Sequence, residues 1–129
     1  MKELAVGDVA KVSRTFTQSD VDEFARVTGD VNPLHIDEEA AARGRFGRPV
    51  AHGLLTASLF SQLLGTVLPG PGSIYLSQTL TFLAPVYPGE QIEASVEIDA
   101  INGNRFILTT VAKKADGTVV LSGTAVVSR

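Results

Sequence analysis

An acidic and an imidazole side chain lie close together in the segment Asp30-Val31-Asn32-Pro33-Leu34-His35. Pro33 fixes its own φ and disfavours the α conformation at the preceding residue, so this segment cannot form one regular helix. Gly29 comes directly before it and permits a left-handed turn. The chain is therefore bent, and the bend can direct Asp30 and His35 at one small volume. A carboxylate and an imidazole placed in this way can hold and activate a water molecule.

The same residues have a plainer interpretation. Asp30 or Asn32 can cap local backbone N–H groups in an Asx turn, with no chemical role. We expect Asn32 to shape the bend more than to react, and we keep it as a candidate for substrate binding. For Asp30 and His35 the spacing favours catalysis, and the resemblance described below strengthens that interpretation.

His52 and Gly53 directly precede a strongly apolar segment, 54–68, which is predicted to be a buried helix. The first N–H groups of a helix lack internal partners and carry the positive end of its dipole. Gly53 lets a ligand carbonyl approach that backbone, so we predict an oxyanion hole there. The alternative is that Gly53 only relieves crowding in a tight turn. We expect His52 to orient the loop rather than to transfer protons.

Ser61 places a hydroxyl among the apolar residues of the predicted helix. A buried hydroxyl needs a partner. That partner is either the carbonyl four residues earlier or a bound ligand, and the sequence does not separate the two. Because no base lies at a readable spacing, we do not expect a nucleophile, and Ser61 stays a candidate for substrate binding beside the back-bonded alternative.

Three arginines, Arg43, Arg45 and Arg48, lie within six residues. They could bind the phosphates of an anionic carrier, although a solvated loop is the slightly preferred interpretation. Two histidines without any cysteine make a metal site improbable, so we expect none. No glycine-rich phosphate-binding motif occurs.

The rest of the pattern indicates how these residues are positioned. A strand is predicted over 9–16, a helix capped by Thr17 or Ser19 and ended by Gly29, and a short helix over 37–43. After the buried helix, strands are predicted over 79–85, 92–100, 106–113 and 119–127, with hairpin turns at 102–104 and 116–117. Hairpin-linked strands after one buried helix suggest an α+β domain, an antiparallel sheet curled around that helix.

Composition narrows the possibilities further. The 129 residues suit a single domain, 1–129, and 44% of them are hydrophobic. A net charge of −3 leaves no basic surface for nucleic acid. The N-terminus has no apolar signal region, and the helix over 54–68 is too short and too polar to span a bilayer. We therefore expect a cytoplasmic protein with no membrane or nucleic-acid partner.

The segment 24–35, followed by 40–42 and His52-Gly53, resembles the hydratase motif of the MaoC-like proteins with the hot-dog fold. The stretches 57–65 and 68–76 are similar to those of the (R)-specific enoyl-CoA hydratases that feed polyhydroxyalkanoate synthesis. The resemblance covers nearly the whole chain, with no departure at the catalytic positions.

This resemblance implies a hot-dog fold, a homodimer, and acyl-CoA bound between subunits. It implies reversible syn hydration of short-chain trans-2-enoyl-CoA to (R)-3-hydroxyacyl-CoA, with no cofactor. Asp30 and His35 would be the catalytic pair, and the Gly53 backbone the oxyanion donor. Ser61 would be a polar group of the site.

Three other functions share this scaffold. A dehydratase acting on acyl carrier protein would use the same chemistry on another carrier. A hot-dog thioesterase commonly has a carboxylate on or near the central helix, whereas 53–68 contains no Asp or Glu. A silent partner subunit or acyl-binding module would be expected to lose the acid–base pair, and both members are present here.

Overall fold

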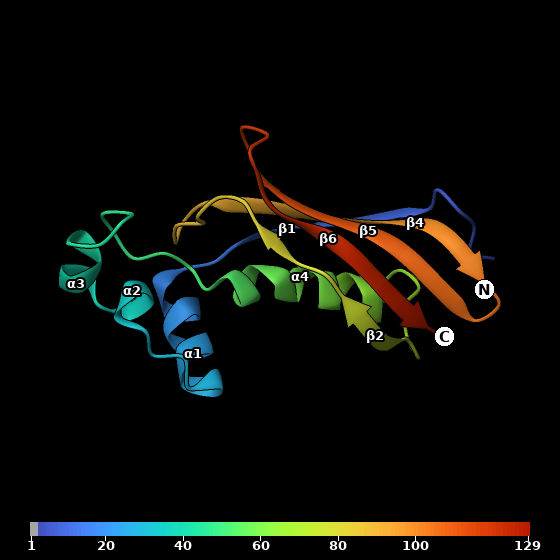
Figure 1. Cartoon of the computed structure of the whole chain (residues 1–129), viewed down its shortest axis with the longest axis horizontal. Coiled ribbons are helices and arrows are strands. Elements are labelled where there is room, and N and C mark those ends of the chain that lie inside the picture. The colour runs from blue at the N-terminus through green and yellow to red at the C-terminus, as the bar shows by residue number, and fades with distance from the viewer. Residues whose placement is uncertain (1–2) are drawn as a thin grey trace.

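An antiparallel sheet forms one layer of the computed structural model, which describes residues 3–129. Its strands lie in the order β1-β4-β5-β6-β2, and β3 pairs with β6. The sheet curves over the central helix α4, as Figure 1 shows. The strands are β1 (Val9–Thr15), β2 (Ile74–Gln78), β3 (Thr81–Phe82), β4 (Gln91–Asn102), β5 (Arg105–Lys114) and β6 (Val119–Ser128).

The three longest strands, β4, β5 and β6, form consecutive hairpins. Apolar and polar residues alternate along β4, so every second side chain from Ile92 to Ile98 is buried on the helix-facing side. Gly103 and Gly117 lie in the two connecting turns with φ of 65° and 91°, a backbone conformation that favours glycine. These elements confirm the hairpins predicted from the sequence.

Helix α4 (Gly53–Thr66) fills the concave side of the sheet. Leu59, Phe60, Leu63 and Leu64 are almost completely buried against the strands. Burial of so many large side chains supplies most of the hydrophobic stabilisation of the fold. The predicted central helix is thus confirmed, with its first residue at Gly53 and its last at Thr66, and the fold class is α+β.

Three shorter helices gather at one end of the sheet (Figure 1): α1 (Gln18–Thr28), α2 (Pro33–Ile36) and α3 (Glu38–Ala42). Thr17 caps α1 in a reciprocal capping box with Asp20. Gly29 ends α1 in the left-handed conformation, with φ of 79°. The caps predicted for this helix are therefore confirmed, and they determine where the chain leaves α1.

The segment 30–35 is bent and is not one regular helix, as predicted. Within it, Pro33 occupies the first position of the four-residue helix α2, where its missing N–H costs nothing. The single strand predicted over 79–85 is wrong. Pairing with β6 begins earlier, at Ile74, and is interrupted before Thr81. At the interruption the Thr79 carbonyl approaches the backbone of Gly123 too closely for any side chain there.

No helix among residues 3–129 combines the length and apolar character needed to cross a bilayer.

Candidate active site

Asp30 follows the left-handed residue that ends α1, so its side chain emerges at the junction of α1 and α2. Its carboxylate accepts a hydrogen bond from the Asn32 backbone at 3.4 Å, and its own N–H donates to the Thr28 hydroxyl at 3.2 Å. The Asp30 side chain is 52% exposed. The carboxylate therefore lies near the protein surface, and hydrogen bonds to neighbouring residues rather than burial hold it in place.

His35 lies on α2 and is buried. Its Nδ1 lies 2.7 Å from the carbonyl oxygen of Val50. Because a carbonyl only accepts hydrogen bonds, Nδ1 must carry the proton of the neutral ring. Nε2 is then left with a free lone pair, which is the form of imidazole that can act as a general base.

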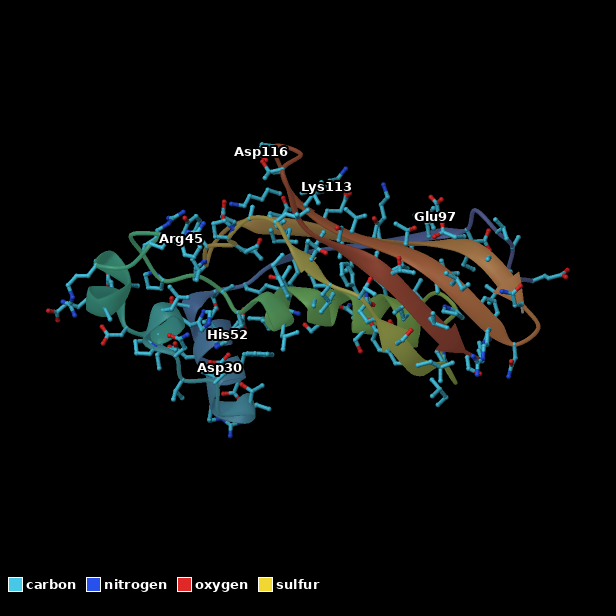
Figure 2. All side chains as sticks on the ribbon, in the orientation of Figure 1. Asp30, Arg45, His52, Glu97, Lys113 and Asp116 are labelled. Carbon is cyan, nitrogen blue, oxygen red and sulfur yellow. The ribbon has the colours of Figure 1, made fainter. Side chains whose placement is uncertain are left out.

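His52 connects the parts of the site. It is 2% exposed, and its Nε2 donates to the backbone carbonyl of Asp30 at 3.0 Å. Its ring stacks on His35 with centroids 3.8 Å apart, and packs against Phe24 at 4.7 Å. Figure 2 shows Asp30 and His52 beside each other at the helical end of the molecule. The expectation that His52 orients this region agrees with these contacts.

Gly53 is the first residue of α4. The N–H groups of Leu55 and Thr56 both donate to the His52 carbonyl, whereas the Gly53 N–H has no partner among the described residues. A Cβ at Gly53 would lie 2.6 Å from Cδ1 of Phe82. Glycine therefore leaves room for the Phe82 ring here, and it is not needed for a left-handed φ. An unpaired N–H at a helix N-terminus suits a developing negative charge.

A cavity of about 510 Å³ joins these groups. Asp30, His35, His52 and Gly53 line it together, so the structure brings the predicted catalytic pair and the predicted oxyanion donor to one place. Most of the remaining wall is apolar and suits a hydrocarbon chain. The wall is completed by Arg45, Phe46, Val50, Ala51, Leu54, Thr56, Phe82, Leu83, Ala84, Pro85, Val86, Val120 and Leu121.

Two of the residues predicted to bind substrate lie outside the cavity wall. The Asn32 side chain accepts from the Leu34 backbone at 3.1 Å and so caps α2, as expected for a residue that shapes the bend. Ser61 is exposed on α4, and its hydroxyl makes neither a back-bond nor a site contact among the described residues. A substrate role for either residue stays a prediction.

The arginines separate into different environments. Arg43 pairs with Glu39 at 3.2 Å, and the Arg48 guanidinium lies 3.7 Å from the ring centroid of Tyr87. Arg45 lines the cavity and has no ion pair within residues 3–129. A solvated loop is the slightly preferred interpretation of the sequence for all three, whereas the position of Arg45 in the cavity wall favours an anion-binding role for that residue.

Asp30, His35 and His52 also offer potential metal ligands, with polar atoms that all lie within 4.8 Å of one another. However, the two imidazole planes are only 26° apart and stacked, so their in-plane lone pairs run along separate planes. A tetrahedral ion at about 2.1 Å from each nitrogen needs lone pairs that converge. The arrangement is better suited to hydrogen bonding.

Some residues of the site gave little sequence signal. The Val50 carbonyl selects the His35 tautomer. Because every residue has a backbone carbonyl, the residue type at position 50 gives no sign of this role. Thr56 is buried on the cavity wall, and its position four residues after His52 was the available signal.

Comparison with known proteins places this arrangement in a family of acyl-thioester hydratases and dehydratases. The MaoC like domain model matches residues 5–119. The chain is 46% identical over 126 residues to an (R)-specific enoyl-CoA hydratase from Aeromonas caviae, covering 96% of this chain and 94% of that relative. It is 45% identical to a 3-hydroxybutyryl-CoA dehydratase from Methylorubrum extorquens, covering 98% of this chain and 81% of that relative.

A solved structure described as an (R)-hydratase from A. caviae involved in PHA biosynthesis superposes with a TM-score of 0.95 at 44% identity, covering 99% of this chain and 98% of that one. This chain therefore belongs to the family of MaoC like domains, and its fold is the hot-dog fold of these hydratases. The resemblance inferred from residues 24–76 is confirmed.

Proposed function

We propose that the protein is an (R)-specific enoyl-CoA hydratase, which adds water reversibly to short-chain trans-2-enoyl-CoA and forms (R)-3-hydroxyacyl-CoA. The observation that carries this proposal is the His35 ring. Its Nδ1 is bonded to Val50, Nε2 is left as a base, and one ring nitrogen lies within 4.8 Å of the Asp30 carboxylate. The relatives named above support the choice of substrate and the (R) configuration.

In the proposed mechanism, Asp30 and His35 hold one water molecule at the cavity rim. His35 Nε2 accepts a proton from that water as its oxygen bonds to the β-carbon of the enoyl thioester. The Asp30 carboxylate accepts the second hydrogen bond and orients the water lone pair. Holding the water close to the β-carbon lowers the entropic part of the barrier.

Electron density then moves through the conjugated system to the thioester oxygen. The unpaired Gly53 N–H donates a hydrogen bond to that oxygen, and the positive end of the α4 dipole adds to the stabilisation. The proton taken from water returns to the α-carbon on the same face, which gives syn addition. Atoms and charge balance without a cofactor.

The carrier is proposed to be coenzyme A, whose phosphates are anionic. Arg45 supports this proposal because it is exposed, lines the cavity, and is not neutralised by a carboxylate of residues 3–129. A guanidinium binds phosphate oxygens through several directed N–H donors.

We further propose a homodimer. Three apolar side chains of the cavity wall remain strongly exposed in the single chain, Leu54 at 60%, Phe82 at 53% and Leu83 at 55%. A second subunit over them would remove apolar surface from water and also shield the half-exposed Asp30 carboxylate. Cytoplasmic location and supply of monomers for polyhydroxyalkanoate are parts of the same proposal.

The test is hydration of crotonyl-CoA, followed by loss of the conjugated thioester absorbance while free thiol is monitored. We expect absorbance loss without thiol release, and chiral analysis should give the (R) product. Thiol release would indicate a thioesterase instead. No change would indicate a silent module or a dehydratase restricted to acyl carrier protein.

The role of the catalytic pair is tested by Asp30→Asn and His35→Gln, with Glu97→Gln on the distant part of the sheet as control (Figure 2). We expect each site variant to lower turnover by about 10²-fold or more, because general acid–base catalysis contributes about that much. Melting temperatures should stay close to that of the parent protein. Near-normal turnover in either variant would overturn the assignment.

A further inference from the structure

Thr56 differs from the other threonines that lie in the helices. The hydroxyls of Thr28 and Thr66 donate to the carbonyl four residues earlier, at 2.7 and 2.6 Å. This back-bond is the default for a threonine in a helix. The Thr56 hydroxyl makes no such bond, although its backbone N–H does reach the His52 carbonyl at 3.3 Å.

The hydroxyl of Thr56 is also fully buried, in a residue that is 2% exposed. A buried hydroxyl without a partner costs free energy, so native proteins rarely keep one without a reason. Within residues 3–129 the only other buried side-chain polar atom without a partner is Nδ1 of His52.

These two atoms are chemically complementary. His52 Nε2 faces the Asp30 carbonyl at 3.0 Å and must therefore carry the ring proton. Nδ1 is then an acceptor that lacks a donor, while the Thr56 hydroxyl is a donor that lacks an acceptor. The two residues lie one helical turn apart and both line the cavity.

We propose that Thr56 is a positioning residue, whose hydroxyl donates to Nδ1 of His52 in the working enzyme. This bond would complete a chain from Thr56 through the His52 ring to the Asp30 carbonyl. Because the His52 ring also stacks on His35, this bond keeps Asp30 and His35 in position relative to each other. Thr56 acts through His52 and does not touch the substrate through its hydroxyl, which is inaccessible.

The variants Thr56→Val and Thr56→Ser separate the hydroxyl from the shape of the side chain. Valine keeps the branched shape and removes the donor, whereas serine keeps the donor. Thr66→Val on the exposed end of α4 is the matched control, because it removes a back-bonded hydroxyl from the same helix. Circular dichroism and melting temperature check that each variant is folded.

The first readout is the nitrogen resonances of His52 in ¹⁵N-labelled protein. We expect a neutral ring protonated at Nε2, and an Nδ1 resonance that moves to higher frequency in Thr56→Val and returns in Thr56→Ser. Packing alone would not move this resonance. An Nδ1 that carries a proton, or an Nδ1 resonance unaffected by Thr56→Val, would overturn the proposal.

The second readout rests on the proposed function. With crotonyl-CoA, Thr56→Val should lower kcat about tenfold, the effect of one lost hydrogen bond, while KM stays within about twofold. Thr56→Ser should restore kcat, and Thr66→Val should not change it. A serine variant as slow as the valine variant would show that shape and not the hydroxyl matters, and would overturn the proposal. If the parent protein does not hydrate crotonyl-CoA, the proposed function fails while the nitrogen resonances still decide the Thr56–His52 bond.

Discussion

Replacement of Gly53 by alanine tests whether the start of α4 is shaped for the substrate. The new Cβ would lie 2.6 Å from Cδ1 of Phe82. Carbon atoms in contact lie about 3.5–4.0 Å apart, so the ring has to retreat by about 1 Å. Phe82 is 53% exposed on the short strand β3, and its ring can move without disturbing the core.

We expect this substitution to change stability only slightly and activity strongly. Stability should change by less than about 1 kcal/mol, because alanine is a good helix former and Gly53 has no left-handed φ. Activity should fall about 10²-fold in kcat/KM, since the methyl group and the displaced ring push the thioester about 1 Å away from the Gly53 N–H.

The assay is hydration of crotonyl-CoA, with chemical denaturation for stability. Gly65→Ala on the same helix is the control, because a Cβ there meets nothing within 4 Å. Gly53→Ala combined with Phe82→Ala relieves the clash but keeps the methyl group, and should recover part of the activity. A Gly53→Ala variant with parental kcat/KM would refute the assignment of this N–H as the oxyanion donor.

Further predictions concern the carrier and the first helix. Arg45→Gln should raise KM for crotonyl-CoA about fivefold and leave a crotonyl thioester without phosphates unaffected, whereas the ion-paired Arg43, changed to Gln, should alter neither. Thr17→Ala should lower the free energy of unfolding by about 1 kcal/mol in urea titrations, through loss of the capping box. The Thr17 backbone N–H lowers the pKa of Asp20 below its ordinary value of 3.8. The stability advantage of the parent over Asp20→Asn should therefore be present above pH 3.8 and disappear as the pH falls below it. An advantage in Tm that persists at lower pH would contradict this.

Elements with a strong local signal could be predicted from the sequence. Thr17 and Gly29 mark the ends of α1, and alternation along Gln91–Asn102 indicates a half-buried strand. The apolar 54–68 segment indicates a central helix. In each case the residues that determine the element lie within it or next to it.

Features set by contacts between distant segments were not predictable in this way. Strand β2 lacks a clear alternation and is defined by its pairing with β6, some fifty residues later. The tautomer of His35 depends on a backbone carbonyl fifteen residues away. The stacking of His52 on His35 likewise requires the residue before α4 to lie against α2, which no local pattern encodes.

The half-exposed position of Asp30 has a consequence for how the site keeps its geometry. A buried catalytic group is held by its packing, but Asp30 is held by its backbone: its carbonyl by His52, its N–H by Thr28, and its carboxylate by Asn32. His52 is itself buried and stacked on His35, so its hydrogen bond to the Asp30 carbonyl ties the half-exposed carboxylate to a buried ring. Because the Thr28 and Asn32 contacts are exposed and contribute little buried area, substitutions that break them should impair turnover well before they impair folding.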